Sequence, residues 1–412
     1  MFNTFSLIFL AALLVMCALR LWLAQRQITH VMAHRGRVPE NFADRVDLKT
    51  HQKAADYTVA RSRFGRIGLA VEVAMLLAFT LGGGLQILHD FWSARLDGLP
   101  YGVALIFSVL LISAIVDLPL SLYHQFVIEA EFSFNRMTLR IFFADHLKQA
   151  ILAIVIGTPV LLAVLWLMAR MGELWWLYVW LFWCTFNLLL LFIYPTWIAP
   201  LFNKFVPLDD ARLRTRVEAL LDRCGFASSD LLVMDGSKRS NHGNAYFTGF
   251  GKTKRIVFFD TLLDRLQAVE IEAVLAHELG HFKYRHVQKR IGMLFVLSLG
   301  FLAILGQLID AGWFFSGLGL TSQNTALGLV LFFLAGPVFA FLLTPLLSLL
   351  SRRDEFQADR YAAAHASASD LVAALVKMYE DNAATLTPDP LHSLFYDSHP
   401  PAALRIARLQ DA

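Results

Sequence analysis

Long apolar runs recur along the chain and constrain its fold more than any other feature of the sequence. Each run has about 20 residues or more, enough for a helix to cross the ~30 Å hydrocarbon core of a bilayer. The runs cover residues 5–24, 67–89, 102–127, 149–169, 174–199, 291–315 and 326–350. Charged residues make up only 17% of the chain, against about 25% in soluble domains. We therefore predict a multi-pass α-helical membrane protein with seven transmembrane helices.

The lysine and arginine residues are distributed unevenly between these runs. They are concentrated between the first and second runs, whereas the 316–325 connection carries no charge. Cytoplasmic loops of membrane proteins are the ones enriched in Lys and Arg. We therefore expect the N-terminus outside, with segment 200–290 and the tail from about residue 351 in the cytoplasm. Short loops and this charge pattern favour a bacterial inner membrane.

The two cytoplasmic segments have the character of a small soluble α/β domain. Strands are predicted at 231–234, 245–247 and 255–259, and helices at 208–225, 267–286, 352–366 and 369–383. The chain then divides into a membrane domain, residues 1–200, with five spans, and a domain of residues 201–412 that includes the last two spans. The net charge of +3, without a basic block, indicates no nucleic-acid partner. We expect a monomer in the lipid bilayer.

The most specific motif is His277-Glu278-Leu279-Gly280-His281. Residues four apart on a helix share one face, so both imidazoles can reach one metal ion. Zinc lowers the pKa of a bound water to about 7, and a neighbouring carboxylate completes its activation. In a chain of this composition the motif is expected by chance only about 0.01 times. We therefore predict one zinc ion per chain and assign Glu278 as the general base.

The third metal ligand must come from another part of the chain, because a catalytic zinc site has three protein ligands and one open position. The turn between the last two apolar runs is centred near residue 320. Antiparallel helices then bring Glu355 to within about two helical turns of His281. Asp359 follows Glu355 by one turn, so one carboxylate can bind the metal while the other supports a ligand. We predict Glu355 as the ligand and Asp359 as the catalytic support. The competing ligands are Asp354, His365 and His392.

Several short stretches, in order along nearly the whole chain, resemble the zinc-dependent CaaX prenyl protease family, the type I CaaX endopeptidases. Besides the HELGH motif, the stretches are residues 53–57, 63–64, 131–138, 200–205, 244–247, 255–263, 351–359 and 398–401. The family pattern has glycine where this chain has Ser133. We expect the chain to be a bacterial member.

The resemblance implies seven helices around a water-filled chamber, with the zinc site of a gluzincin-like cytoplasmic domain facing it. It also implies a peptide or lipidated-peptide substrate that lies along an edge strand; the strand residues are Asn244, Ala245, Tyr246 and Phe247. It further implies that His399 contacts the substrate, with Arg405 near it. Because two prolines stiffen the loop after His399, we expect this side chain to stabilise the oxyanion as a hydrogen-bond donor.

Together these features predict a zinc-dependent membrane endopeptidase that cleaves near the C-terminus of prenylated CaaX-type peptides by Glu-assisted attack of zinc-bound water. The main alternative is a quality-control membrane metalloprotease of the smaller heat-shock type, which would resemble only the catalytic half. A site-2 type intramembrane protease fits less well, because its HExxH motif lies within a span. A receptor or transporter with a decayed site would have lost a ligand or the base.

Overall fold

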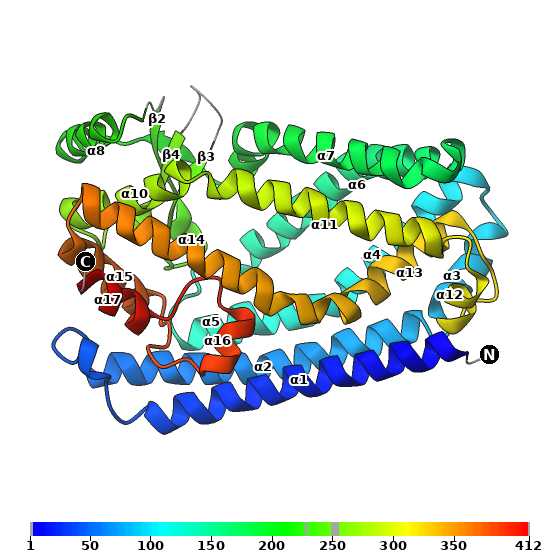
Figure 1. Cartoon of the computed structure of the whole chain (residues 1–412), viewed down its shortest axis with the longest axis horizontal. Coiled ribbons are helices and arrows are strands. Elements are labelled where there is room, and N and C mark those ends of the chain that lie inside the picture. The colour runs from blue at the N-terminus through cyan, green and yellow to red at the C-terminus, as the bar shows by residue number, and fades with distance from the viewer. Residues whose placement is uncertain (1–2, 227–229, 249–254, 411–412) are drawn as a thin grey trace.

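The computed structural model describes residues 3–226, 230–248 and 255–410. Long helices run roughly along the longest axis of the molecule, with the small sheet and the C-terminus toward one end and the N-terminus at the other (Figure 1). Six helical stretches are long and apolar enough to cross a membrane, and a bent pair of helices makes up to seven. The predicted multi-pass helical fold is confirmed.

Most of the membrane helices extend beyond the apolar runs, whereas α11 both begins and ends earlier than the run 291–315. The six stretches are α1 (Thr4–His34); α4 (Gly98–Tyr123) with η2 (His124–Ile128) and α5 (Glu129–Glu131); α6 (Leu139–Arg170); η3 (Gly172–Leu174), α7 (Trp175–Ile193), η4 (Tyr194–Ile198) and η5 (Ala199–Leu201); α11 (His286–Leu308); and α13 (Thr325–Ala340), η8 (Phe341–Leu343) and α14 (Thr344–His365). The bent pair is α2 (Leu48–Phe79) and α3 (Gly84–Ser93).

The bend between α2 and α3 follows from three consecutive glycines. The two helices meet at 48°. Gly83 has φ +77°, a left-handed conformation that only glycine adopts readily. A Cβ on Gly84 would lie 2.7 Å from the carbonyl oxygen of Ala78. The predicted run 67–89 therefore contains parts of two helices.

The backbone at position 133 has a conformation that favours glycine, which is the residue of the family pattern. This chain has serine there. Ser133 has φ +64°, a region where a side chain costs roughly 1–2 kcal/mol and glycine costs little. Its carbonyl oxygen accepts a hydrogen bond from Asn241 Nδ2 at 2.7 Å. The strained turn after α5 is thus tied to the loop that precedes the strand at residues 245–248.

The α/β part contains a four-stranded sheet. The strands are β1 (Phe205–Pro207), β2 (Asp230–Met234), β3 (Ala245–Thr248) and β4 (Arg255–Phe259), in the order β1-β2-β4-β3. The β2–β4 pair is parallel, and β1–β2 and β3–β4 are antiparallel. The three predicted strands are present, and β1 was not predicted. Asn244, which was expected among the strand residues, lies just before β3.

The remaining described helices surround the sheet or connect the spans. They are η1 (Glu40–Phe42), α8 (Ala211–Arg223), η6 (Gly236–Lys238), α9 (Asp260–Leu263), α10 (Ala268–Lys283), α12 (Gly312–Gly317), α15 (Ala368–Asp381), α16 (Pro390–Tyr396) and α17 (Ala402–Gln410). One hydrophobic core, including Ile256 and Leu275, joins the sheet to these helices. A second, including Phe9, Leu105 and Leu305, lies among the membrane helices.

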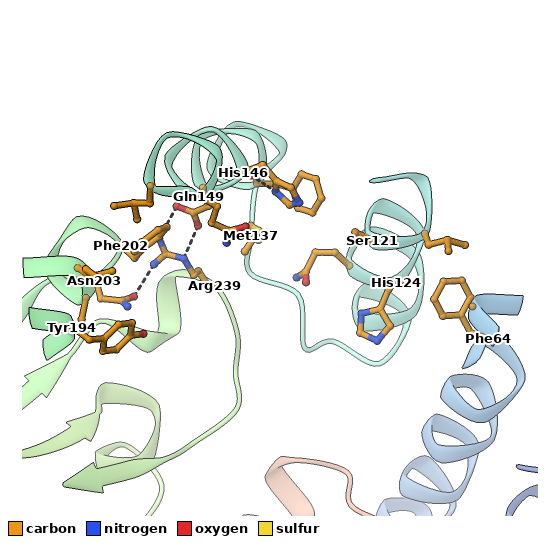
Figure 2. A pocket seen from close by; sticks show the side chains of 18 residues that line it. Phe64, Ser121, His124, Met137, His146, Gln149, Tyr194, Phe202, Asn203 and Arg239 are labelled. Carbon is orange, nitrogen blue, oxygen red and sulfur yellow. Dashed lines mark hydrogen bonds and ion pairs between the residues drawn. The ribbon is translucent and has the colours of Figure 1, made fainter. Parts of the chain in front are cut away.

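A cavity of about 920 Å³ lies where the membrane helices meet the α/β part. Figure 2 shows Arg239 at its wall, directed toward α6. Arg239 donates two hydrogen bonds to Asp145 of α6, at 2.8 and 3.1 Å, and one to Asn203 at 2.8 Å. Because Asp145 is buried, this ion pair fixes the α/β part to the membrane helices.

Candidate metal centre and active site

Helix α10 carries both histidines of the HELGH motif. A capping box starts the helix, in which the backbone N–H of Gln267 donates to Glu270 at 2.7 Å. The helix packs closely on α14 at Gly280, where a Cβ would lie 2.8 Å from the Cα of Ala358. Glycine therefore allows the two helices to approach, and their close approach brings side chains of both to one point.

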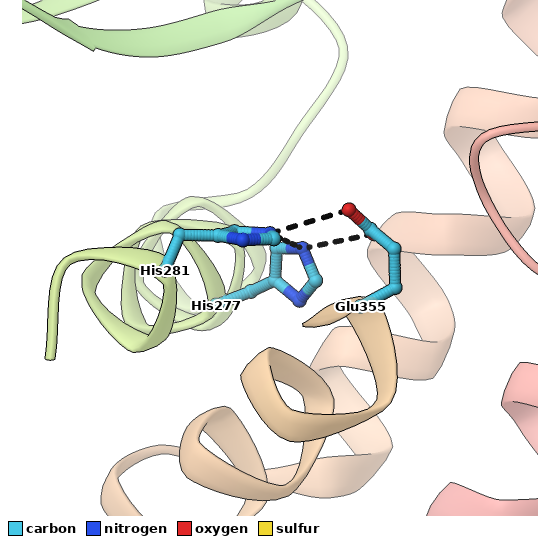
Figure 3. Close-up of side chains that lie close together, drawn as sticks. All are labelled: His277, His281 and Glu355. Atoms are coloured by element: carbon cyan, nitrogen blue, oxygen red, sulfur yellow. Dashed lines mark hydrogen bonds and ion pairs between the residues drawn. The ribbon is translucent and has the colours of Figure 1, made fainter. Parts of the chain in front are cut away.

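His277, His281 and Glu355 meet at this point, with their side chains directed toward one another (Figure 3). The two histidine Nε2 atoms are 3.2 Å apart. Carboxylate oxygens of Glu355 lie 3.5 Å from Nε2 of His277 and 3.3 Å from Nε2 of His281. One ligand atom from each residue fits within 4.8 Å of the others. The competing candidates are outside this cluster; they are Asp354, His365 and His392.

The chemistry of this cluster fits a catalytic zinc ion. Glu355 is 4% exposed, and its Oε2 atom has no hydrogen-bond partner in the described part of the chain. Its nearest polar neighbours, His277 Nε2 at 3.5 Å and Arg405 Nη1 at 3.8 Å, are too far for a good hydrogen bond, and a bound cation would supply the closer partner. Two imidazoles and one carboxylate, with a fourth position open, are a known ligand set of catalytic zinc.

Asp359 orients His277 from the side opposite the cluster. Its Oδ1 lies 2.9 Å from Nδ1 of His277, which leaves Nε2 for a metal. Arg405 donates two hydrogen bonds to Asp359, at 2.9 and 2.6 Å. Burial disfavours a charged His277, but the neighbouring carboxylates of Asp359 and Glu355 outweigh this effect and raise the pKa of His277 to about 9 in the absence of metal.

His286 supports the second ligand, and the sequence analysis did not single it out. Its Nδ1 lies 2.9 Å from Nδ1 of His281, and its Nε2 lies 3.0 Å from Oε1 of Gln357. An amide oxygen only accepts, so His286 donates from Nε2 and accepts from His281 at Nδ1. His281 Nε2 is then available for metal. Arg285, with φ +56°, interrupts the helix just before His286. The signal available in the sequence was a histidine five residues after a ligand.

His399 lies beside the three ligand residues, and Glu278 follows His277 in the sequence of α10. Glu278 is half-buried. His399 Nε2 is 3.5 Å from Glu355 Oε1, and its side chain is 63% exposed. His399 thus lies at the rim of the cluster, where it can reach a molecule that enters from the solvent side.

The predicted substrate strand lies next to the same helix. Phe247 of β3 packs on Phe282 of α10, with ring centroids 5.4 Å apart. In the described sheet, β3 is an edge strand that pairs only with β4. Asn244, just before the strand, is exposed, whereas Ala245 is buried and Tyr246 half-buried. Such an edge can accept another extended chain.

Arg405 differs in its surroundings from the other residues expected to bind substrate. It is 5% exposed and has its guanidinium engaged by Asp359, with Glu355 Oε2 at 3.8 Å. This position favours an indirect role through Asp359 and His277. The expected contact between Arg405 and a substrate stays a prediction.

Two family models together cover almost the whole chain. Residues 27–204 match the model described as CAAX prenyl protease N-terminal, five membrane helices. Residues 207–412 match the model of peptidase family M48. The membrane half and the peptidase half therefore each resemble the corresponding part of one kind of protein.

Full-length relatives show the same similarity. The CAAX prenyl protease 1 homolog of Arabidopsis thaliana is 35% identical, over 96% of this chain and 95% of the relative. CAAX prenyl protease 1 of Saccharomyces cerevisiae is 33% identical, over 90% and 88%. The crystal structure of Ste24p from S. mikatae aligns with a TM-score of 0.91 at 31% identity, covering 99% of both chains.

These relatives are eukaryotic, so the expectation of a bacterial member in a bacterial inner membrane is not borne out by them. The similarity to the CAAX prenyl proteases extends through the membrane half, which does not favour the quality-control alternative. The chain belongs to the CAAX prenyl protease family of the M48 peptidases, and it is a multi-pass membrane protein and a zinc metalloendopeptidase.

Proposed function

We propose that this protein hydrolyses a peptide bond near the C-terminus of prenylated CAAX-type peptides. The observation that carries the proposal is the convergence of His277, His281 and Glu355, with Glu278 next to His277 in sequence and the edge strand of the described sheet next to α10. The substrate class is supported by the names of relatives that match nearly the whole chain.

The proposed centre holds one zinc ion per chain through His277, His281 and Glu355. When bound, zinc polarises the substrate carbonyl and lowers the pKa of a water molecule. Glu278 accepts a proton from the attacking water and passes it to the departing amine, a role that suits a carboxylate adjacent to a ligand residue. Asp359 keeps His277 in the tautomer that has Nε2 free.

His399 is proposed to donate from Nε2 to the carbonyl oxygen as negative charge develops there. One such donor is worth about 2.7–4 kcal/mol, or roughly 10²–10³ in rate. The role is supported by the 3.5 Å separation of His399 Nε2 from Glu355 Oε1 and by its exposure to the open side. Arg405 is proposed to act by holding Asp359, because both side chains are buried and paired.

The substrate is proposed to add as an extended strand to the free edge of β3, along Asn244, Ala245, Tyr246 and Phe247. Main-chain hydrogen bonds then supply affinity, and only an unfolded segment can bind in this way. A folded globular protein presents no such segment. This selectivity agrees with processing near a chain terminus.

We also propose that residues 1–200 form a membrane domain with five spans and residues 201–412 the peptidase domain. The two family matches meet between residues 204 and 207, close to this boundary. The arrangement of Lys and Arg supports an outside N-terminus and an active site on the cytoplasmic side. We propose a monomer as the functional unit.

The test is cleavage of a short synthetic peptide that ends in a farnesylated CAAX sequence, by purified protein in detergent, with products identified by mass spectrometry. We expect a single cut between the modified cysteine and the next residue. Glu278→Gln should give no product, and phenanthroline should stop the wild type. Digestion of unfolded membrane proteins without cleavage of the peptide would instead favour the quality-control function.

A further inference from the structure

A second cavity, of about 610 Å³, extends from the rim of the metal cluster. His399 and Asn244 line it on the side of the active site, and Tyr57 and Arg61 of α2 line it from the membrane part. Its volume is within the ~300–1,000 Å³ range of ligand sites. The cavity therefore connects the expected substrate strand to a helix that the proposed catalytic chemistry does not use.

Arg61 is the one Lys or Arg side chain among the residues that line this cavity, and it is exposed. In the described chain, no carboxylate lies within ion-pair distance of Arg61. Two more deeply buried arginines do have such partners: Arg239 pairs with Asp145, and Arg405 with Asp359. An arginine at a cavity wall without an acidic partner is free to bind an anion.

The position of Arg61 is supported by a buried group on the same helix. Its guanidinium carbon lies 5.4 Å from the ring centroid of Tyr57. The Tyr57 hydroxyl donates to Glu129 at 2.5 Å, and both of these side chains are buried. The Tyr57 ring is thus fixed, and it provides a surface on which the guanidinium rests beside the cavity.

The direction of the expected substrate strand leads its C-terminal end into this cavity. Strand β3 pairs antiparallel with β4, and an antiparallel strand added to its free edge would end beside the first residues of β3. Asn244 precedes β3 and lines the cavity. The three residues that follow the cut bond in a CAAX peptide extend about 10 Å at ~3.4 Å each, so a substrate bound antiparallel to β3 would place its terminus within the cavity.

We propose that Arg61 binds the free C-terminal carboxylate of the substrate, and that this cavity holds the residues released by the cut. The inference rests on the proposed function and adds a recognition site to it. Asp397 is the one carboxylate among the lining residues, and its charge disfavours an anion on its own side of the cavity. The substrate terminus is therefore directed to the α2 side, where Arg61 can make paired hydrogen bonds to both oxygens.

The experiment compares two farnesylated CAAX peptides that differ only in a C-terminal carboxylate or carboxamide. Wild-type protein should prefer the carboxylate by roughly 10-fold to 100-fold in kcat/KM, the usual value of a charge-assisted hydrogen-bonded pair. In Arg61→Gln this ratio should fall to about one, mainly through a higher KM for the carboxylate peptide. Arg61→Lys should keep part of the preference, because it keeps the charge but loses the paired geometry.

Arg63→Gln is the matched control, since Arg63 is exposed on the same helix and does not line the cavity; its ratio should equal that of the wild type. Zinc content and thermal unfolding verify that Arg61→Gln is folded. Equal cleavage of both peptides by the wild type, or a full preference retained in Arg61→Gln, would overturn the inference while leaving the proposed function intact. If neither peptide is cleaved by zinc-loaded wild type, the proposed function fails and the inference with it.

Discussion

Replacing Asp359 by leucine separates two roles that this buried carboxylate has in the structure. Asp359 accepts two hydrogen bonds from Arg405 and lies 2.9 Å from Nδ1 of His277, with only 3% of its surface exposed. Removing one partner of a buried ion pair costs about 3–5 kcal/mol, because the other charge stays buried. Removing the carboxylate behind a metal-binding histidine weakens metal affinity about 10-fold to 100-fold.

A second substitution tells these effects apart. Asp359→Leu with Arg405→Met removes both charges, and apolar replacement of a buried pair is often neutral or stabilising. The double variant should therefore recover most of the lost stability and yet still bind zinc weakly, because His277 has no carboxylate partner. The control is Glu40→Gln, in the ion pair with Arg37, where both side chains are at least 80% exposed; it should change stability by less than about 1 kcal/mol.

The measurements are thermal unfolding of metal-free protein in detergent and zinc competition with a fluorescent chelator. Metal-free protein is needed because bound zinc itself raises the apparent stability. Our reasoning would be wrong if the double variant regained wild-type zinc affinity, since Asp359 would then act only through folding. Unchanged zinc affinity in Asp359→Leu alone would be equally damaging.

Three further predictions follow from the site and the topology. His286→Phe should weaken zinc binding about 10-fold to 100-fold by removing the partner of a ligand histidine; chelator competition measures it, and unchanged affinity would exclude the role. Because the pKa of His277 is about 9 without metal, zinc binding near pH 7.5 should release about one proton, against about 0.1 for an ordinary histidine. Calorimetry in buffers of different protonation enthalpy decides this, and a release below about 0.3 would contradict it. In a cysteine-free background, cysteines at Ser93 and Thr321 should react with an impermeant thiol reagent from outside, and one at Glu218 only after lysis; the opposite pattern would invert the topology.

Much of the fold follows from apolar runs, but helix ends do not. Hydrophobicity reports where lipid surrounds a helix, whereas the backbone hydrogen bonds continue into water wherever the sequence permits. The run 326–350 is therefore only part of the stretch Thr325–His365, which contains α14. The helix predicted at 352–366 is the last part of this stretch, and Glu355 lies on it. Strand β1 has only three residues and one proline, too few for an alternating pattern.

The ligand residues that share one helix could be predicted from the sequence. Residues that other helices contribute to the site were harder to predict. His277 and His281 follow from local spacing, and Glu355 from the geometry of the last hairpin. His286 could not be recognised in the same way, because its contact with His281 depends on the interruption of the helix at Arg285. Arg61 lies in α2, far along the sequence from the motif, and only the tertiary fold brings it to a cavity shared with His399.

The most direct test of the account is the zinc content of purified variants, measured by mass spectrometry alongside peptide cleavage. We predict about one zinc per chain in the wild type and in Glu278→Gln, with cleavage lost only in the latter, because a general base is not a ligand. Glu355→Ala should lose both zinc and cleavage. A Glu355→Ala protein that retains a full zinc ion, or a Glu278→Gln protein that still cleaves, would contradict the proposed centre.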